Sequence, residues 1–561
     1  FFEEVLKNKD TTGIFIFPVK ALSNDQQHKF EKFNIGTYAK YDGDIDTKSK
    51  KCIRNDPPNA LFTNPDSLHM SILQTHTEWE DFFSNLKFIV LDELHYYKGF
   101  FGSNTSNILF RLLKVAQRYG GDPRIICTSA TIPEGEKFAK KLAWKDFQLI
   151  EESGAGRSEK QVLMVAPHED LHQLSLLKDT TIKLFNMKKQ TIIFCNSRIT
   201  VNTAAYYIKT YLGGDSFKIS GYHAGYTKEE RLEIENKFKQ QEIEVLITTN
   251  AMELGIDIGD LDACILFGLP HQNSAIWQRI GRAGRSYEKQ SLALIINTDS
   301  KIDEYFFENP DQLMDTKDNP EEPVISPYNR VIGKRHLQCA LFENIKEKDL
   351  EEQDKEIWDE LDSDVNRPAH YWAMPIRSSW GIKYDIIDQN GDKLNEINYD
   401  RVYKDLHHRA IYQHEGSFYK SIKIDHKNKR VYIEEFDNEN KLTSPFVDSN
   451  AYINEISEEK IRDYPDIEII VGKGKVSVIN EVKSYIQKDL IRLTENYCVN
   501  SYKDGNSLRT KSVWVSIPKT KEKTVLHSVS HLMIRKFVQK GHCDWQDFAA
   551  VTIKHPHFND D

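Results

Sequence analysis

The chain has 561 residues, of which 39% are hydrophobic and 29% charged, and its formal net charge at pH 7 is -10. This length predicts about three to four domains with separate cores in a globular protein. We find no signal peptide and no apolar run near the ~20 residues of a membrane helix, so we expect no membrane partner. Seven cysteines without a CxxC pair favour reduced thiols and a cytoplasmic location. The acidic charge disfavours wholesale wrapping of nucleic acid but allows a local basic channel.

Short apolar runs alternate with helix-like stretches over residues 1–150. The runs at residues 13–18, 59–64, 87–93 and 124–131 each end in small or polar residues. Apolar runs of this length are typical of strands buried on both faces, and their alternation with helices predicts a parallel sheet. We therefore expect an α/β domain over residues 1–150.

A second α/β domain is predicted over residues 151–310. It begins with the polar, glycine-bearing stretch at residues 151–160, which indicates a linker. Five further strand-like runs follow, and they indicate a second sheet in tandem with the first. These runs lie at residues 190–198, 217–225, 244–250, 263–270 and 291–297.

An acidic connector and helical region is predicted over residues 311–405. The stretch at residues 308–323 is rich in proline and acids, and residues 346–364 have the charge pattern of a solvated helix. A functional acidic tail is the alternative for the second stretch.

The last region, residues 406–561, is expected to be a β-rich accessory domain that leads into the start of a further C-terminal domain. Apolar and polar residues alternate over residues 410–434, with the turn DHKNK, which predicts antiparallel hairpins. Two more strand-like runs lie at residues 467–472 and 475–485.

Two patterns in this last region have alternative interpretations. Aromatic residues of the hairpins suit either base stacking or the core of a small domain. A histidine pair four residues apart, with another histidine and a cysteine nearby, suits either a metal site or the face of an ordinary apolar helix. The aromatic residues are Tyr412, Phe418, Tyr419 and Tyr432, and the metal candidates are His527, His531, His542 and Cys543.

Two adjacent carboxylates, Asp92 and Glu93, directly follow the third apolar run. The carboxyl ends of strands in open α/β sheets face the ligand crevice, so we expect these acids to point towards substrate. One carboxylate suits a Mg²⁺ held by phosphates, and its neighbour suits the activation of water for attack on a phosphoryl group. An acidic turn after a strand is the alternative for DELH by itself.

The stretch at residues 248–262 combines a predicted strand end with features of a nucleotide site. Gly255 and Gly259 permit tight backbone turns, and Asp257 offers a carboxylate to a ribose hydroxyl.

Further along the chain, glycines are interleaved with arginines in QRIGRAGR, residues 278–285. Arg282 and Arg285 are three residues apart, so on a helix they would project from one face, as two guanidiniums that reach one γ-phosphate require. The alternative, a solvated basic helix end, fits poorly with the interleaved glycines.

Seven segments resemble the motifs of superfamily 2 helicases, in the usual order. FPVKAL, TNPD, DELH, SAT, IIFCNSR, TTNAMELGIDIGD and QRIGRAGR correspond to motifs Ia, Ib, II, III, IV, V and VI, over about residues 14–297. YDGD, DELHYYKGFFGSN and TVLHSVSHLMIRKF are similar to the MrfA/YprA-type DNA helicases and their RecQ-four-like fungal relatives.

The resemblance implies an α/β fold with tandem RecA-like parallel-sheet domains, followed by a smaller α+β, β-rich accessory region. It implies an ATP-dependent DNA helicase or translocase that moves 3′ to 5′ and acts in DNA repair, with ATP and Mg²⁺ as cofactors and single-stranded or tailed duplex DNA as partner. A nucleic-acid clamp without turnover and an RNA helicase are the alternatives.

The resemblance also assigns roles in catalysis. Asp92 would bind Mg²⁺, and Glu93 would polarise the attacking water. Gln278 would contact the γ-phosphate or couple it to motif II, while Arg282 and Arg285 would complete the site when the cleft closes.

Coupling, nucleotide and nucleic-acid contacts follow in the same way. His95, Ser129 and Thr131 would couple the domains, the hydroxyls of SAT by hydrogen bonds between the two sheets, and Gly255 and Asp257 would hold the nucleotide. The nucleic-acid contacts would come from loops at strand ends, where hydroxyl, amide and basic groups suit sequence-independent tracking of one strand. They are Lys20, Thr63, Asn64, Asp66, Asn196, Ser197, Arg198, His223, Thr248 and Asn250.

Two expected segments are missing from the sequence. No GxxxxGK[ST] phosphate loop occurs, and by the family's order it would precede Phe1. The family's four-cysteine zinc cluster would follow Asp561, so zinc is expected only there. We interpret the chain as a fragment clipped at both ends that hydrolyses no ATP by itself; a degenerate, non-hydrolysing paralogue is the alternative.

Overall fold

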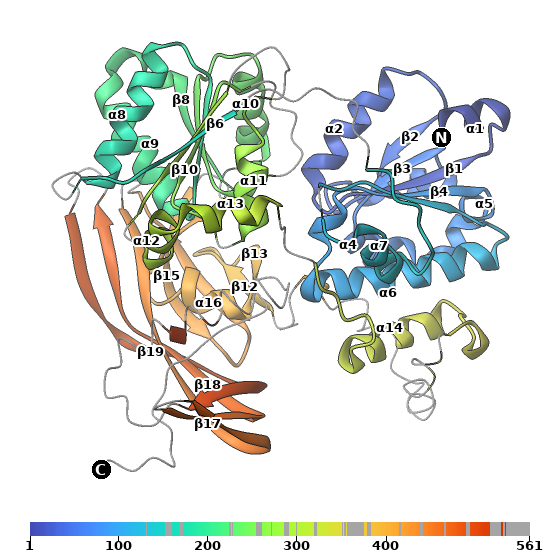
Figure 1. Cartoon of the computed structure of the whole chain (residues 1–561). Helices are drawn as coiled ribbons and strands as arrows, with labels where there is room; N and C mark the ends of the chain where they lie inside the picture. Colours follow the sequence, from blue (N-terminus) through green and yellow to red (C-terminus); the bar gives the residue numbers. More distant parts are fainter. Residues whose placement is uncertain are drawn as a thin grey trace. The chain divides into compact units, whose positions relative to one another are not determined.

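The computed structural model describes residues 1–130, 132–151, 160–168, 172–223, 226, 228–253, 261–270, 272–284, 291–298, 300–318, 323–350, 352, 355, 375–377, 383–414, 417–437, 441–464, 467–489, 494–516, 529–530 and 533 (Figure 1). The chain divides into two compact units. One contains the described residues within Phe1–Asn196 and Thr248–Ser379, and the other those within Ser197–Ile247 and Trp380–Lys536.

A parallel five-stranded sheet forms the first α/β domain, in the strand order β2-β3-β1-β4-β5. The strands are short and, apart from the edge strands, mostly buried, as the apolar runs predicted. They are β1 (Thr12–Ile16), β2 (Tyr38–Lys40), β3 (Ala60–Thr63), β4 (Leu86–Leu91) and β5 (Arg124–Cys127).

Successive side chains of a strand point to opposite faces of the sheet, and each face of this sheet packs in its own core. Ile14 and Ile16 of β1 join a core with residues of α6 (Gly99–Arg118) and α7 (Gly135–Ala143), whereas Phe15 packs in a second core with Leu22 of α2 (Lys20–Glu31). The remaining helices are α1 (Phe2–Lys7), α3 (Thr47–Asn55), α4 (Pro65–Ser67) and α5 (Glu80–Ser84), with single turns at Leu68–Ile72, His76–Trp79 and Leu94–Tyr96.

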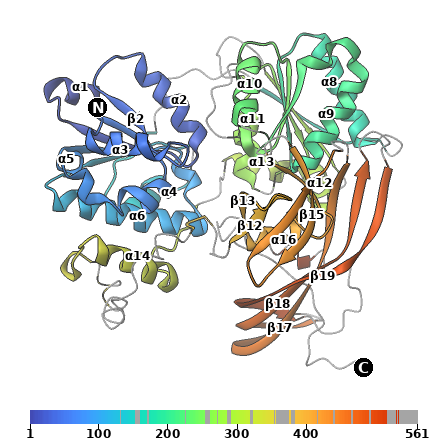
Figure 2. The ribbon, with the colours of Figure 1, turned by 180° about the vertical axis from the view of Figure 1, so that it is seen from behind.

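The second sheet has six strands in the order β6-β11-β10-β7-β9-β8, and β6, β11, β10 and β7 are parallel. Its strands and helices alternate along the chain (Figure 2). The strands are β6 (Lys160–Val165), β7 (Thr191–Cys195), β8 (Ile219–Tyr222), β9 (Val245–Thr248), β10 (Ala263–Phe267) and β11 (Ser291–Ile296), and the helices are α8 (Gln173–Asn186), α9 (Arg198–Leu212), α10 (Lys228–Lys239), α11 (Asn273–Ile280), α12 (Lys301–Glu308) and α13 (Pro310–Asp318).

These two sheets confirm the predicted tandem RecA-like architecture. The sequence reading missed β2, which has only three half-buried residues, and β6, in which buried and exposed positions alternate instead of forming an apolar run.

The proline- and acid-rich stretch at residues 308–323, predicted to be a connector, contains helix α13 (Pro310–Asp318). Pro310 occupies the first position of α13. The N–H at this position has no intrahelical acceptor, so proline, which lacks this N–H, is tolerated there. α13 contacts α11, and the following helix, α14 (Arg330–Phe342), packs against α6 of the first domain. Of residues 346–364, the structure describes a single turn at Glu347–Asp349 and little else, so the predicted solvated helix lies mostly outside the described residues.

The accessory region contains two sheets. The first has the strand order β13-β12-β16-β15-β14, with β14, β15 and β16 in the predicted antiparallel hairpins and β12 parallel to β16. Tyr412 and Tyr419 pack against its buried cluster. Its elements are β12 (Lys383–Ile387), β13 (Lys393–Asn398), α16 (Tyr399–Asp405), β14 (Ile411–His414), β15 (Ser417–Asp425) and β16 (Arg430–Glu435).

Three long antiparallel strands form the other accessory sheet: β17 (Lys441–Tyr464), β18 (Ile467–Asp489) and β19 (Thr494–Ser516) (Figure 2). The two runs expected at residues 467–472 and 475–485 are one strand, because the backbone stays extended through Gly474. A Cβ at Gly474 would lie 1.9 Å from the Glu455 carbonyl oxygen, so this crossing needs glycine. The candidate metal group at His527, His531, His542 and Cys543 lies outside the described residues.

No helix in the described part of the chain is long and apolar enough to cross a membrane. The predicted limits of the four domains remain a prediction.

Candidate active site and nucleic-acid interface

Asp92 lies at the carboxyl end of β4, beside the end of β1, where its N–H donates to the Ile16 carbonyl oxygen at 3.1 Å. Its Oδ1 accepts from the Thr128 hydroxyl and from the Glu93 N–H, the latter at 3.0 Å. Oδ2 has no hydrogen-bond partner among the described residues. The carboxylate is therefore oriented through one oxygen and offers the other to a ligand.

Glu93 adopts a left-handed backbone conformation, with φ 54° and ψ 54°. For a residue other than glycine this conformation costs about 1–3 kcal/mol, and such strain is concentrated at functional sites. The Glu93 N–H bond to Asp92 and the Leu94 N–H bond to the Thr128 carbonyl oxygen, at 2.7 Å, hold the turn. The chain thus bends sharply just after the strand, and both acids stay half-buried at its end.

His95 joins motif II to the SAT segment within the first domain. Its Nδ1 accepts from the Ala130 N–H at 3.4 Å and lies 3.3 Å from Ser129 Oγ and 3.5 Å from Glu93 Oε2. Burial, with the charge of Lys98, lowers the pKa of His95 to about 4, so the ring is neutral at pH 7. Ser129 contacts His95 within its own domain, and Thr131 lies outside the described residues.

Arg282 lies beyond the end of α11, which corrects the expectation that it projects from the face of a helix. α11 ends at Ile280; beyond it, Ala283 makes an isolated parallel bridge with Leu261, and Gly284 has φ 67°. Gly281 follows the helix in an ordinary right-handed conformation, with φ −63°, whereas the positive φ of Gly284 is one that glycine adopts readily. Arg282 is 7% exposed and donates to the Glu253 carbonyl oxygen. Arg285 lies outside the described residues.

The sequence reading missed Arg279 and Glu253, which form an ion pair with Nε and Oε2 at 2.9 Å. Arg279 is 5% exposed, and its guanidinium lies 5.3 Å from the ring centroid of Phe194. Arg279 and Arg282 both bind Glu253, so motif VI holds the start of motif V. The sequence signal for this ion pair was the presence of an acid, Glu253, in motif V and an arginine, Arg279, in motif VI. Gln278 is half-buried on α11, and Gly255 and Asp257 lie outside the described residues.

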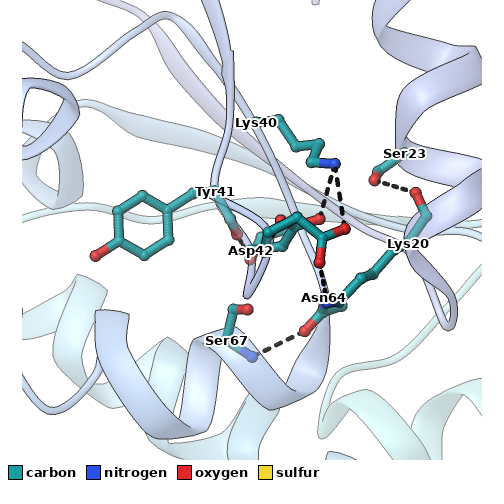
Figure 3. Close-up of polar contacts among 9 residues, drawn as sticks. Lys20, Ser23, Lys40, Tyr41, Asp42, Asn64 and Ser67 are labelled. Carbon is teal, nitrogen blue, oxygen red and sulfur yellow. Dashed lines mark hydrogen bonds and ion pairs between the residues drawn. The ribbon is translucent and has the colours of Figure 1, made fainter. Parts of the chain in front are cut away.

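Figure 3 shows two candidate nucleic-acid contacts of the first domain, Lys20 and Asn64, near Tyr41 and Asp42 of the YDGD segment. Lys20, at the start of α2, pairs with Asp44 at 2.5 Å and stays 46% exposed. Thr63 and Asn64 are buried: the Thr63 hydroxyl donates to the Tyr41 carbonyl oxygen at 2.7 Å, and Asn64 Oδ1 accepts from the Ser67 N–H at 2.8 Å. Both side chains therefore shape the loop.

In the second domain, several candidates are likewise engaged by the fold. Asn196 Nδ2 donates to the Leu269 carbonyl oxygen at 3.0 Å, and Ser197 Oγ caps α9 by accepting from the Thr200 N–H at 3.0 Å. Thr248 is buried at the end of β9, and Asn250 is exposed.

The pKa values of His223 and Arg198 are both lowered by their surroundings. His223 is fully buried, its Nε2 lies 3.0 Å from Asn202 Oδ1, and burial together with Arg198 lowers its pKa to about 4. Partial desolvation, with the charge of Arg401, lowers the pKa of Arg198. His223 is thus neutral at pH 7, and Arg198 is the cation of this group.

Comparison with known proteins identifies the family. Residues 1–138 match the DEAD/DEAH box helicase family, and residues 172–287 match the helicase conserved C-terminal domain. The chain is 32% identical over 470 residues to the uncharacterized ATP-dependent helicase YprA of Bacillus subtilis (strain 168), covering 78% of this chain and 62% of YprA. A crystal structure of the DUF1998 helicase MrfA bound to DNA matches with a TM-score of 0.81 and 26% identity, over 97% of this chain and 77% of that one. The chain belongs to the MrfA/YprA-type superfamily 2 helicases.

A second MrfA crystal structure, bound to DNA and AMPPNP, matches with a TM-score of 0.74 and 27% identity, over 90% of this chain and 72% of that one. The chain spans 62% of the length of YprA and 54% of the length of the uncharacterized ATP-dependent helicase MJ1574 of Methanocaldococcus jannaschii, less than two thirds in each case.

Asp92 fits the Mg²⁺ that this helicase family implies, while Gly255 and Asp257, the candidates for holding the nucleotide, lie outside the described residues. Asp92 presents Oδ2 without a hydrogen-bond partner in the described part of the chain, at a strand end where a phosphate-bound Mg²⁺ needs one carboxylate oxygen. The described residues contain no cluster of three or more acidic, histidine or cysteine side chains placed for a metal, so phosphates and water would supply the other ligands.

Proposed function

We propose that the protein containing this chain is an ATP-dependent DNA helicase or translocase that moves 3′ to 5′ along single-stranded DNA and acts in DNA repair. The observation that carries the proposal is the motif II turn, in which Thr128 and the left-handed Glu93 fix Asp92 with one carboxylate oxygen uncommitted. The similarity to MrfA bound to DNA and AMPPNP supports ATP and DNA as the ligands.

The two acids have separate tasks in this proposal. Asp92 Oδ2 is the protein ligand for Mg²⁺, which when bound neutralises phosphate charge. Glu93, in the sharp turn that follows the strand, orients and polarises the attacking water. His95, neutral at pH 7, acts as a link between Glu93 and Ser129 and not as the base.

The second domain supplies the remaining groups. We assign Arg285 to the γ-phosphate, Gln278 to coupling with motif II, and Gly255 and Asp257 to the nucleotide. Arg282 has its Nη2 committed to the Glu253 carbonyl oxygen, which supports a role in holding motif V.

DNA contacts are assigned to the exposed candidates, Lys20 in the first domain and Ser197, Arg198 and Asn250 in the second. Backbone N–H groups of the loops shaped by Thr63 and Asn64 would add contacts to phosphate. A backbone-directed interface of this kind fits tracking without sequence preference.

Strand displacement by the full-length protein tests the proposal. With ATP, we expect it to displace a labelled strand from a 3′-tailed DNA duplex, and not from 5′-tailed DNA or from the matching RNA duplex. Displacement from 5′ tails alone would reverse the polarity, and preference for RNA would favour the RNA helicase. Binding to tailed DNA without ATP turnover would identify a clamp.

The sequence contains no GxxxxGK[ST] phosphate loop, so we also propose that residues 1–561 alone hydrolyse no ATP. DNA-stimulated phosphate release by the isolated chain would contradict this.

A further inference from the structure

Arg377 binds two loops of the first domain at once, although it follows them by more than 300 residues. Its Nε donates to Asp66 Oδ2 at 2.8 Å, and its Nη2 donates to the Pro18 carbonyl oxygen at 2.6 Å. The guanidinium also lies 4.1 Å from the ring centroid of Phe101. These contacts use both the donor fork and the flat face of the guanidinium, a combination that lysine cannot reproduce.

The chain around Arg377 is anchored on the first domain. The preceding residue, Ile376, is 1% exposed in the core of that domain. Further upstream, the Gly99 N–H donates to the Val324 carbonyl oxygen at 2.8 Å. The segment that carries Arg377 is therefore fixed on the domain by more than the arginine itself.

The two loops that Arg377 joins are those expected to contact DNA. Pro18 belongs to motif Ia and lies two residues before Lys20, and Asp66 belongs to motif Ib. Asp66 is an unsuitable phosphate ligand, since both groups are anionic. Its pairing with Arg377 gives this carboxylate a different task, which is to tie its loop to motif Ia.

Packing extends from Arg377 to motif II. Phe101 stacks on Tyr97, with ring centroids 5.7 Å apart, and the Tyr97 hydroxyl donates to the Ile16 carbonyl oxygen at 3.4 Å. The same carbonyl oxygen accepts the Asp92 N–H. The DNA-facing loops and the catalytic turn thus share one packed group of side chains.

We propose that Arg377 is a positioning residue that holds motifs Ia and Ib in the spacing that single-stranded DNA requires. This inference rests on the proposed function, because it assumes that the two motifs bind DNA. Arg377 acts through Asp66 and the Pro18 carbonyl group and makes no contact with the reacting atoms.

The test uses the full-length protein and a labelled oligo(dT) strand, with affinity from fluorescence anisotropy and half-saturating DNA concentration from DNA-stimulated ATP turnover. For Arg377→Ala we expect both DNA concentrations to rise about three- to tenfold, the range for a partly exposed charge-assisted contact. The kcat at saturating DNA should fall much less. Arg377→Lys should recover only part of the loss.

Lys145→Ala is the matched control. Lys145 also joins a carboxylate, Asp122 at 3.2 Å, to a backbone carbonyl oxygen, that of Pro123 at 3.1 Å, and its side chain is 34% exposed against 38% for Arg377. It lies outside every motif, so its replacement should leave DNA affinity unchanged. Asp66→Asn should weaken binding, and the double variant with Arg377→Ala should be no weaker than the more affected single variant.

The inference would be overturned if Arg377→Ala left DNA affinity unchanged, or lowered it no more than Lys145→Ala does. It would also be overturned if the losses of DNA affinity in Arg377→Ala and Asp66→Asn were fully additive in the double variant. A wild-type protein that neither binds oligo(dT) nor shows DNA-stimulated turnover would instead contradict the proposed function. The two failures are distinguishable because the first requires a wild-type protein that responds to DNA.

Discussion

The Thr128 hydroxyl orients the motif II turn by donating a hydrogen bond to Asp92 Oδ1. The positions of Asp92 and Glu93 could be predicted, because two acids that directly follow an apolar run indicate ligand-binding side chains at the end of a strand. The hydroxyl that orients Asp92 could not be predicted, since it belongs to the residue that follows β5, 36 residues further along. Only the pairing of β5 with β4 brings the two together. Arg377 shows the same limit over a longer separation.

Replacing Thr128 with valine should lower kcat for DNA-stimulated ATP turnover by about three- to tenfold, because valine matches the shape of threonine but cannot donate to the Asp92 carboxylate. Phosphate release by the full-length protein measures the effect. Thr128→Ser keeps the hydroxyl and should retain most activity. Equal rates for Thr128→Val and wild type would show that this hydrogen bond does not organise the site.

Helices α6 and α14 show why the connector was hard to place from the sequence. Most strands of the first two sheets could be predicted, since their apolar runs are local. The packing of α14 on α6 joins residues more than 200 positions apart through a buried polar group that has no local pattern. Arg111 donates to both carboxylate oxygens of Glu343, and Arg111 and Glu343 are 1% and 0% exposed. His336 adds an Nδ1 contact to Arg111 at 3.0 Å.

Arg111→Met should lower the free energy of unfolding by about 3–5 kcal/mol, because it leaves the Glu343 carboxylate buried without its partner. Urea denaturation followed by circular dichroism measures the change. The double variant Arg111→Met with Glu343→Leu removes both charges and should recover most of the stability. A single variant as stable as wild type would mean that α14 is not held on α6 by this pair.

At the scale of the whole molecule, burial lowers the pKa of five described histidines, which are His76, His95, His223, His336 and His407. The pKa values of His95, His223 and His407 are each lowered from 6.5 to about 4, in every case mainly by burial. In the unfolded chain these rings would bind protons below pH 6.5, whereas in the fold they resist protonation down to about pH 4. Their contribution to stability is therefore complete above pH 6.5 and is lost as the pH falls towards 4.

The melting temperature should accordingly fall between pH 7 and pH 5, with each histidine contributing about 2 kcal/mol of lost stability at pH 5. Differential scanning fluorimetry across this range measures the fall. His223→Gln keeps a donor for Asn202 and cannot titrate, so the decline with pH should be shallower in this variant. A decline as steep as that of wild type would contradict the buried, neutral assignment.

The tandem architecture, the family and the acids of motif II were all predictable, because each rests on short contiguous segments. The return of the chain to the first domain was not, because long-range packing leaves no periodic signal. The proposed mechanism depends most on the separate roles of Asp92 and Glu93.

The most direct measurement compares wild-type and Glu93→Gln full-length protein for DNA-stimulated ATP hydrolysis and for DNA binding. We expect the substitution to reduce turnover at least 100-fold while DNA affinity changes less than about threefold, because glutamine cannot polarise the attacking water and Glu93 does not face DNA phosphates in this account. Turnover that survives the substitution, or hydrolysis and DNA binding lost together, would contradict it.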